Sequence, residues 1–333
     1  MDEEVKNYVR GTLKIVRRSR RESFGFEVLS SLELPYLSTG LSCNFKNGVK
    51  CCFGGFDVLR MVCCDDNMKF NQMYSVRKSE IVNKVMWIPD HFRKYPEILL
   101  VACQDLWLYE CEDMKLIPRW RAGFGNKINP IVNFDWSYWD PSYISTIQKN
   151  GDCVLWSMEK EQEIFRLPSE FLYKPKLKIG SHNNSNCHMG LCFCRNVLNN
   201  CLITYGENTS NFMHDMRCPT GKYALTFREP ILDIKCSFCN PWHVAYFFRN
   251  KVLVIDVRRP EEQKYKFKKF PCDVGTCISW SPFKDEIAIG TSSGRCIFWD
   301  LERNEYLSIF HDRINFIKKV TYHHSKEVLF INC

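Results

Sequence analysis

Apolar residues occur along the chain in short bursts, and turn-forming residues separate the bursts. In the clearest case, apolar runs at 286–289 and 296–301 flank the segment Gly290-Thr291-Ser292-Ser293-Gly294. Two short apolar runs around a glycine-containing turn are typical of a tight β-hairpin. Runs with the 3.6-residue period of an amphipathic helix are scarce. The pattern therefore predicts an all-β protein.

One kind of burst recurs and ends on an aromatic or apolar residue followed by a polar or acidic one. It occurs at 106–110, 154–157, 212–215, 253–256 and 297–300. Its equivalent positions lie 47, 58, 41 and 44 residues apart and are Tyr109, Trp156, His214, Ile255 and Trp299. A recurring period of this size indicates repeated structural units.

A second kind of burst opens the units and carries a tryptophan, as at Trp87, Trp136 and Trp280. A proline follows each one within a few residues, where the missing N–H is tolerated past the end of a strand. Two interleaved signals at one period predict a β-propeller. In that fold, stacked blades bury faces that one four-stranded blade would leave exposed.

The length fits one propeller, because 333 residues at about 40–45 residues per blade make seven or eight blades. We expect a single seven-bladed WD-repeat β-propeller over residues 1–333, with insertions near 33–55 and 160–185. The strands that line the central channel are predicted at 85–88, 132–136, 231–236 and 277–280. The tryptophans expected to be structural are Trp87, Trp136, Trp156, Trp280 and Trp299.

Composition narrows the class of protein. Hydrophobic residues make up 45% of the chain and charged residues 25%, which permits a sizeable core and argues against disorder. The net charge of +8 permits acidic partners without requiring nucleic acid. The start Met-Asp-Glu-Glu is unlike a secretory signal, and no apolar run is long enough to span a membrane. Nineteen cysteines, several of them inside apolar strand patterns, favour a reducing compartment, and we expect the cytoplasm and nucleus.

Several segments resemble a known family. They are Lys84-Val85-Met86-Trp87-Ile88-Pro89-Asp90 with 95–99, 133–136 with 140–143, 215–217, 254–260 and 277–282. Together they resemble the WD-repeat scaffolds that include the DDB/cullin-associated factors of animals and the transparent-testa-glabra and anthocyanin regulators of plants. The resemblance implies a seven-bladed propeller that holds kinases or transcription regulators together. It also implies docking to a cullin-type ubiquitin-ligase adaptor.

Two Asp-x-Arg pairs stand at predicted blade ends, Asp215 with Arg217 and Asp256 with Arg258. Residues two apart on a strand share a face. The resemblance implies that this Asp-x-Arg ending faces the ligase adaptor, and the four residues are therefore the candidate partner-binding residues. The alternative is a local ion pair at an exposed rim, which contributes little to stability.

Cysteine and histidine spacing raises the question of a metal. Cys236 and Cys239 have CxxC spacing but lie in an apolar strand segment, where residues three apart point to opposite faces. The richer cluster contains His182, Cys187, His188, Cys192 and Cys194. The alternative is a loop followed by a strand with small buried thiols. We expect no metal and no cofactor.

Arg17, Arg18, Arg20 and Arg21 form a basic run, which is typical of a nuclear-import or nucleic-acid patch or of a solvated turn. The sequence contains no Gly-rich phosphate loop, nucleophile elbow or zinc-protease motif. The favoured function is a non-catalytic scaffold for kinases or transcription regulators. The alternatives are a substrate receptor docked on a ubiquitin-ligase adaptor and a nucleic-acid-associated propeller.

Ring closure gives a further expectation. Residues 4–9 are expected to supply the outermost strand of the final blade, and residues 13–16 and 24–29 the opening strands of the first. Residues 317–322 and 327–332 should form two strands of the final blade. That blade should then hold three strands or gain a substitute strand from elsewhere, and an incomplete blade would leave an edge open to a partner strand.

Overall fold

The computed structural model describes residues 11–18, 26–34, 40–44, 49–55, 58–89, 95–113, 115–122, 130–137, 140–168, 188–193, 201–206, 210–215, 218–260, 262–267, 273–310, 316–322 and 328–333. Within these residues the chain forms 28 β-strands, which pair into seven antiparallel four-stranded sheets. The prediction of an all-β protein is confirmed. No helix in the described part of the chain is long and apolar enough to cross a membrane.

Six of the seven sheets each use four consecutive strands, and we call them blades 1 to 6. Blade 1 contains β3 (Gly40–Asn44), β4 (Val49–Gly54), β5 (Val58–Cys64) and β6 (Phe70–Arg77). Blade 2 contains β7 (Lys84–Trp87), β8 (Ile98–Ala102), β9 (Leu106–Glu112) and β10 (Lys115–Ala122). Blade 3 contains β11 (Ile131–Trp136), β12 (Tyr143–Gln148), β13 (Cys153–Ser157) and β14 (Gln162–Leu167).

The remaining blades follow in chain order, and the last one also takes strands from the start of the chain. Blade 4 contains β15 (His188–Phe193), β16 (Cys201–Gly206), β17 (Ser210–Asp215) and β18 (Cys218–Thr226). Blade 5 contains β19 (Ile231–Cys236), β20 (His243–Phe248), β21 (Val252–Asp256) and β22 (Gln263–Phe267). Blade 6 contains β23 (Gly275–Trp280), β24 (Glu286–Thr291), β25 (Arg295–Asp300) and β26 (Glu305–Phe310). Blade 7 contains β27 (Lys319–Tyr322), β28 (Val328–Asn332), β1 (Gly11–Arg18) and β2 (Phe26–Leu34).

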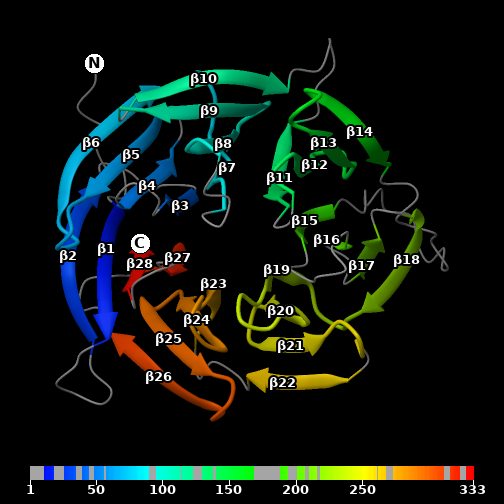
Figure 1. Ribbon diagram of the computed structural model, residues 1–333. Coiled ribbons are helices and arrows are strands. Elements are labelled where there is room, and N and C mark those ends of the chain that lie inside the picture. Colours follow the sequence, from blue (N-terminus) through cyan, green and yellow to red (C-terminus); the bar gives the residue numbers. More distant parts are fainter. Residues whose placement is uncertain are drawn as a thin grey trace, which may run out of the picture.

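The blades stand around a central axis, as Figure 1 shows. The first strand of each blade lies innermost and contacts the first strands of its two neighbours, from β3 through β7, β11, β15, β19, β23 and β27 back to β3. The four channel-lining strands predicted from the sequence are β7, β11, β19 and β23. The prediction of a seven-bladed β-propeller is therefore confirmed.

Burial differs between the strands of one blade. Every position of the middle strands β4, β20 and β24 is buried. In contrast, the outermost strand β14 buries only its last residue. The middle strands are apolar on both faces because each blade packs between two others. One apolar cluster accordingly joins Ala245 and Phe247 of blade 5 to Trp280 and Trp299 of blade 6.

The five tryptophans expected to be structural are all buried. A buried indole N–H needs a hydrogen-bond partner. Trp136 Nε1 donates to the Pro141 carbonyl at 2.7 Å, and Trp299 Nε1 donates to Asn304 Oδ1 at 3.3 Å. Asn304 has a φ of 54° in the β25–β26 turn, a conformation that asparagine tolerates better than most residues. These bonds connect core tryptophans to the turns beside them.

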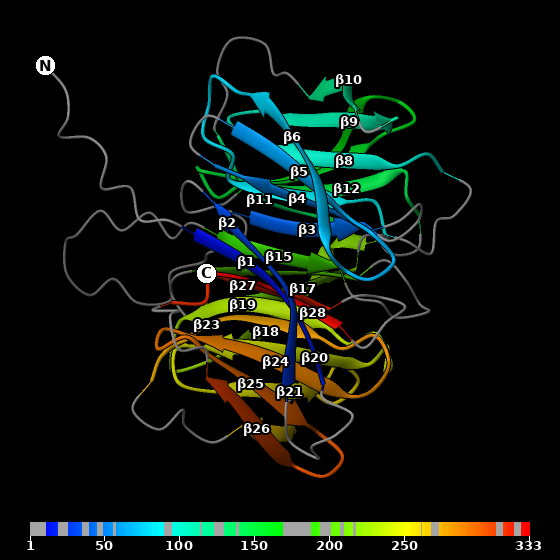
Figure 2. The same cartoon turned by 90° about the vertical axis from the view of Figure 1, so that its left-hand side faces the viewer.

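The expectation of an incomplete final blade is wrong. Blade 7 has four strands, and β1 pairs with β28 from Leu13↔Asn332 to Arg17↔Val328. Figure 2 shows both N-terminal strands running along this blade. The strands expected to open the first blade therefore close the last one, and no edge of β28 is left unpaired. Residues 4–9 lie outside the described residues.

The expected insertion at 33–55 is also corrected, because this range contains β3 and β4, the two inner strands of blade 1. Its strands are rich in Gly, Ser and Cys rather than large apolar residues, and small thiols such as Cys51 and Cys52 fill the core there. In the second range, 160–185, Gln162–Leu167 forms β14, and 169–185 lies outside the described residues.

Candidate functional site

The Asp256–Arg258 pair lies where β21 ends, at the outer part of blade 5. Asp256 accepts from the backbone N–H of Arg258 at 3.0 Å, from its Nε at 2.9 Å and from its Nη2 at 2.6 Å. The hydrogen bond from Arg258 lowers the pKa of Asp256 to about 2. The guanidinium also lies 4.7 Å from the ring centre of Trp242. The local ion pair thus forms. It holds the Arg258 side chain, which remains 54% exposed, over the aromatic ring of Trp242.

The second Asp-x-Arg pair is placed only through its backbone. Asp215 is the last residue of β17 and pairs in register with Cys201 of β16. Arg217 and the side chain of Asp215 lie outside the described residues.

The candidate metal ligands are only partly described. Cys236 is buried at the end of β19, whereas Cys239 is exposed. His188 and Cys192 belong to β15, and the cluster members His182, Cys187 and Cys194 lie outside the described residues. Among described residues, no three histidine, cysteine or acidic side chains lie close enough together to hold a metal ion.

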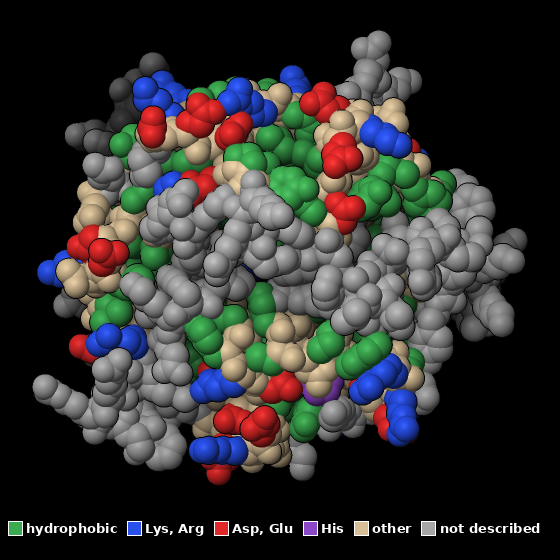
Figure 3. All heavy atoms as spheres, in the orientation of Figure 1, with side chains coloured by type: hydrophobic (Ala, Val, Ile, Leu, Met, Phe, Trp, Pro, Cys, Tyr) green, Lys and Arg blue, Asp and Glu red, His purple; other side chains and the backbone are tan. Residues whose placement is uncertain are grey.

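The basic run begins at the end of β1. Arg17 Nη2 forms an ion pair with Glu27 Oε2 of β2 at 3.0 Å, so a neighbouring strand balances its charge. Arg18 ends β1, and Arg20 and Arg21 lie outside the described residues. On the face seen in Figure 3, acidic and basic side chains lie interspersed around the periphery.

A cavity of about 450 Å³ lies at the centre of the ring, and residues from all seven blades line it. Most of its lining comes from the inner strands. In β11 and β19 a β-bulge follows the first residue, at Val132 and Leu232. A bulge leaves one residue out of the ladder. Both bulged side chains line the cavity, Val132 41% exposed and Leu232 47% exposed.

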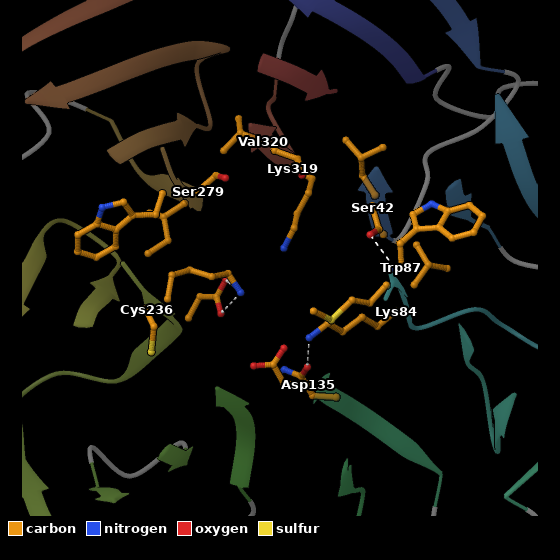
Figure 4. A pocket seen from close by; sticks show the side chains of 18 of the residues that line it. Ser42, Lys84, Trp87, Asp135, Cys236, Ser279, Lys319 and Val320 are labelled. Atoms are coloured by element: carbon orange, nitrogen blue, oxygen red, sulfur yellow. Dashed lines mark hydrogen bonds and ion pairs between the residues drawn. The ribbon is translucent and has the colours of Figure 1, made fainter. Parts of the chain in front are cut away.

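Charged side chains also line this cavity, and the sequence analysis did not identify them. They are Lys84, Asp135, Asp233, Lys235 and Lys319. Figure 4 shows Lys84, Asp135 and Lys319 directed into the same space. One signal could have revealed them: when the inner strands are aligned on their last residues, the charges recur at the same two positions. Lys84, Asp233 and Lys319 stand three residues before the end, and Asp135 and Lys235 stand one before it.

A partly buried polar network joins blade 5 to blade 6, and no sequence motif marks it either. Asp285 accepts from Ser237 Oγ at 3.1 Å and lies 3.3 Å from Nδ1 of His243. Asn240 contacts the other ring nitrogen of His243 at 3.2 Å. Burial alone would raise the pKa of Asp285, but the adjacent His243 and the hydrogen bond from Ser237 lower it. The carboxylate is therefore held charged at the boundary between the blades.

Comparison with known proteins supports the fold and suggests a relative. No protein-family model matches the chain. The chain is 24% identical over 228 residues to the "DDB1- and CUL4-associated factor 7 homolog" of Dictyostelium discoideum, a match covering 66% of this chain and 65% of that protein. The matched part is thus just under two thirds of the relative's length. The crystal structure of Chaetomium thermophilum Raptor superposes with a TM-score of 0.67 at 13% identity, over 89% of this chain and 27% of that one. This second likeness concerns the fold alone.

Proposed function

We propose that the protein is a non-catalytic scaffold that binds other proteins at the rim of its propeller. The observation that carries this proposal is the Arg258 side chain, exposed yet fixed by Asp256 and lying over Trp242. Arginine and tryptophan are enriched among residues that dominate binding energy at protein interfaces. A side chain already held in one position loses less conformational entropy when a partner binds. Kinases and transcription regulators are the partners we propose for this role.

A second candidate function is that of a substrate receptor docked on a cullin-type ubiquitin ligase. The name of the Dictyostelium relative associates that protein with DDB1 and CUL4. On this chain we place the adaptor contact at Asp256 and Arg258, at the end of blade 5. Asp215 and Arg217 would extend the contact from the end of β17 in blade 4.

The test is an affinity pull-down analysed by mass spectrometry, together with binding to purified DDB1. Arg258→Glu would place a carboxylate beside Asp256 and break the bidentate pair. The matched control is Arg303→Glu, because Arg303 is also exposed and follows an aspartate, Asp300, at the end of the equivalent strand β25.

Loss of DDB1 with Arg258→Glu, but not with Arg303→Glu, would support docking at this rim. Recovery of kinases or transcription regulators without DDB1 would support the scaffold alone. If Arg258→Glu recovers the same proteins as the wild type, the rim is not the binding surface and the proposal for this site is wrong.

A further inference from the structure

The central cavity gathers five charged side chains from four inner strands. Lys84 comes from β7, Asp135 from β11 and Lys319 from β27. Asp233 and Lys235 both come from β19. Three ammonium groups against two carboxylates leave an excess of one positive charge in the lining. Because these strands belong to blades far apart in the sequence, only the closed ring brings the charges together.

The two carboxylates do not pair with all three ammonium groups. Lys235 Nζ forms an ion pair with Asp233 at 3.2 Å. Lys84 Nζ donates to Asn133 Oδ1 at 2.8 Å and to the Phe134 carbonyl, and both of these acceptors are neutral. Within the described part of the chain, the side chain of Lys319 makes no hydrogen bond or ion pair. Two of the three ammonium groups thus face the cavity without an ion-pair partner among the described residues.

This arrangement disfavours the charged state of the lysines. Burial, together with the positive charges of Lys235 and Lys319, lowers the pKa of Lys84 to about 8, although the charges of Asp135 and Asp233 act in the opposite direction. Burial and the charge of Lys235 also lower the pKa of Lys319. An anion among these groups would reverse both effects, because it would supply the opposite charge that the cavity lacks.

Neutral groups around the lysines also suit an anion. The Oγ of Ser42 accepts from the Trp87 backbone N–H at 3.0 Å, and the Oγ of Ser279 accepts from the Tyr322 N–H at 3.4 Å. Both serines line the cavity, and each keeps its own O–H to donate. The exposed side chains of Val132 and Leu232 add an apolar part to the same wall. Ligand pockets of about 300–1,000 Å³ typically combine such apolar walls with a few polar groups.

We propose that the central cavity binds a small phosphate monoester. Lys84, Lys235 and Lys319 would hold the phosphate group, which carries between one and two negative charges at neutral pH. Lysine binds phosphate as a compact point charge with three donors. Val132 and Leu232 would contact the organic part of the ligand. This binding site lies on the axis of the ring and is independent of the rim at Arg258.

The test measures binding of phenyl phosphate, with inorganic phosphate and phenol as separate arms, by isothermal titration calorimetry. Lys319→Met is the main variant, because it removes an ammonium group with no hydrogen-bond or ion-pair partner among the described residues. Lys318→Met is the matched control, because Lys318 is the neighbouring residue but does not line the cavity. Circular dichroism and thermal unfolding show whether each variant is folded.

We expect phenyl phosphate to bind the wild type and Lys318→Met with similar affinity, and Lys319→Met at least about tenfold more weakly. Binding should take up protons near pH 8, because the phosphate raises the pKa of Lys84 from about 8. The other titratable side chains that line the cavity are Asp135, Tyr205, Asp233, Lys235, Cys236 and Lys319. Calorimetry in buffers of different ionisation enthalpy measures this uptake.

Inorganic phosphate binding as tightly as phenyl phosphate would assign the site to the free ion and would overturn the ester. Equal affinity of wild type and Lys319→Met for phenyl phosphate would place binding outside the cavity. Phenol binding as tightly as the ester, or no saturable binding at ligand concentrations on the order of 10 mM, would overturn the proposal.

Binding of an acidic peptide without phosphate binding would instead assign the cavity to a partner's side chains. The Arg258→Glu variant should bind phenyl phosphate with wild-type affinity. The proposal for the cavity and the proposal for the rim can therefore be rejected independently of each other.

Discussion

The blade interfaces and the central cavity are built from the same inner strands, yet they differ in chemistry. In β19, Ile231, Ile234 and Cys236 are buried in the core between blades. Asp233 and Lys235, on either side of Ile234, line the cavity together with the bulged Leu232, and Ile231 and Cys236 also contribute to its wall. Strand geometry turns neighbouring side chains to opposite faces. One face of the strand therefore maintains the ring, and the other is free to carry charges that a core could not accommodate.

The largest expected effect is in the core. Trp299→Ala should reduce the free energy of unfolding by ~3–5 kcal/mol, because it leaves a cavity beside Trp280 and Ile287. Its cross-strand neighbour Tyr306, 62% exposed, provides the control. Tyr306→Ala should change stability by about 0.5 kcal/mol or less. Denaturant titration measures both, and equal losses would mean that β25 and the outermost strand β26 are equally important for stability.

The next effect is at the boundary between blades 5 and 6. Asp285→Ala should cost about 1–3 kcal/mol, because Ser237 and His243 would lose a buried partner. The pKa of Asp285 is lowered in the folded state. The carboxyl of Asp285 has a pKa of about 4 in the unfolded chain. Its stabilising contribution is therefore fully present above that pH and is lost as the pH falls through its lower pKa in the folded protein. The stability difference between wild type and variant should narrow in acid, and a difference independent of pH would contradict this.

In the cavity the expected sign is reversed. Lys319→Met should leave the protein as stable as the wild type or more stable by about 1 kcal/mol at pH 7, because it removes a buried ammonium group near Lys235. The pKa of Lys319 is lowered on folding, so the folded state loses its proton first and wild-type stability gains as the pH rises toward the usual value near 10.5. The stability advantage of Lys319→Met over the wild type should therefore decrease as the pH rises. A large loss of stability would show that Lys319 belongs to the structural side of the strand.

The smallest effect is expected at the rim. Arg258→Glu should leave the thermal unfolding midpoint unchanged, because the Arg258 side chain is 54% exposed and exposed ion pairs contribute little. The same change should raise the pKa of Asp256 from about 2, since it removes the hydrogen bond that lowers it. NMR titration of the carboxylate would measure that shift, and an unchanged value would mean that the pair does not form in solution.

The sequence predicted the parts of the fold that repeat. Trp87, Trp136 and Trp280 mark inner strands because large apolar residues that recur at one period are typical of stacked structural repeats. The hairpin at 290–294 was also predictable, because Gly294 adopts a φ of 77° in the turn between β24 and β25.

The remaining features depend on which strands meet, and a local pattern does not contain that information. β1 and β2 have the pattern of an ordinary hairpin, and nothing in it shows that β1 pairs with β28. A lysine within a strand, such as Lys84, usually indicates a solvated face. Its position in the central cavity with Lys235 and Lys319 follows only from ring closure. The Asp285 network was missed for the same reason, because its members belong to two blades.

Ring closure also determines when the protein can finish folding. Leu13 pairs with Asn332, and Thr12 exchanges backbone hydrogen bonds with Cys333 at 3.0 and 2.9 Å. On the ribosome, β1 and β2 are made before any other described strand, yet they complete their blade only after β28 has been synthesised. Until then the edge of β1 that will pair with β28 is exposed. An incompletely folded chain with an exposed strand edge is prone to wrong pairing. Completion of this ring consequently requires strands from both ends of the described chain, and β1 reaches its partner β28 only after all the other blades have been made.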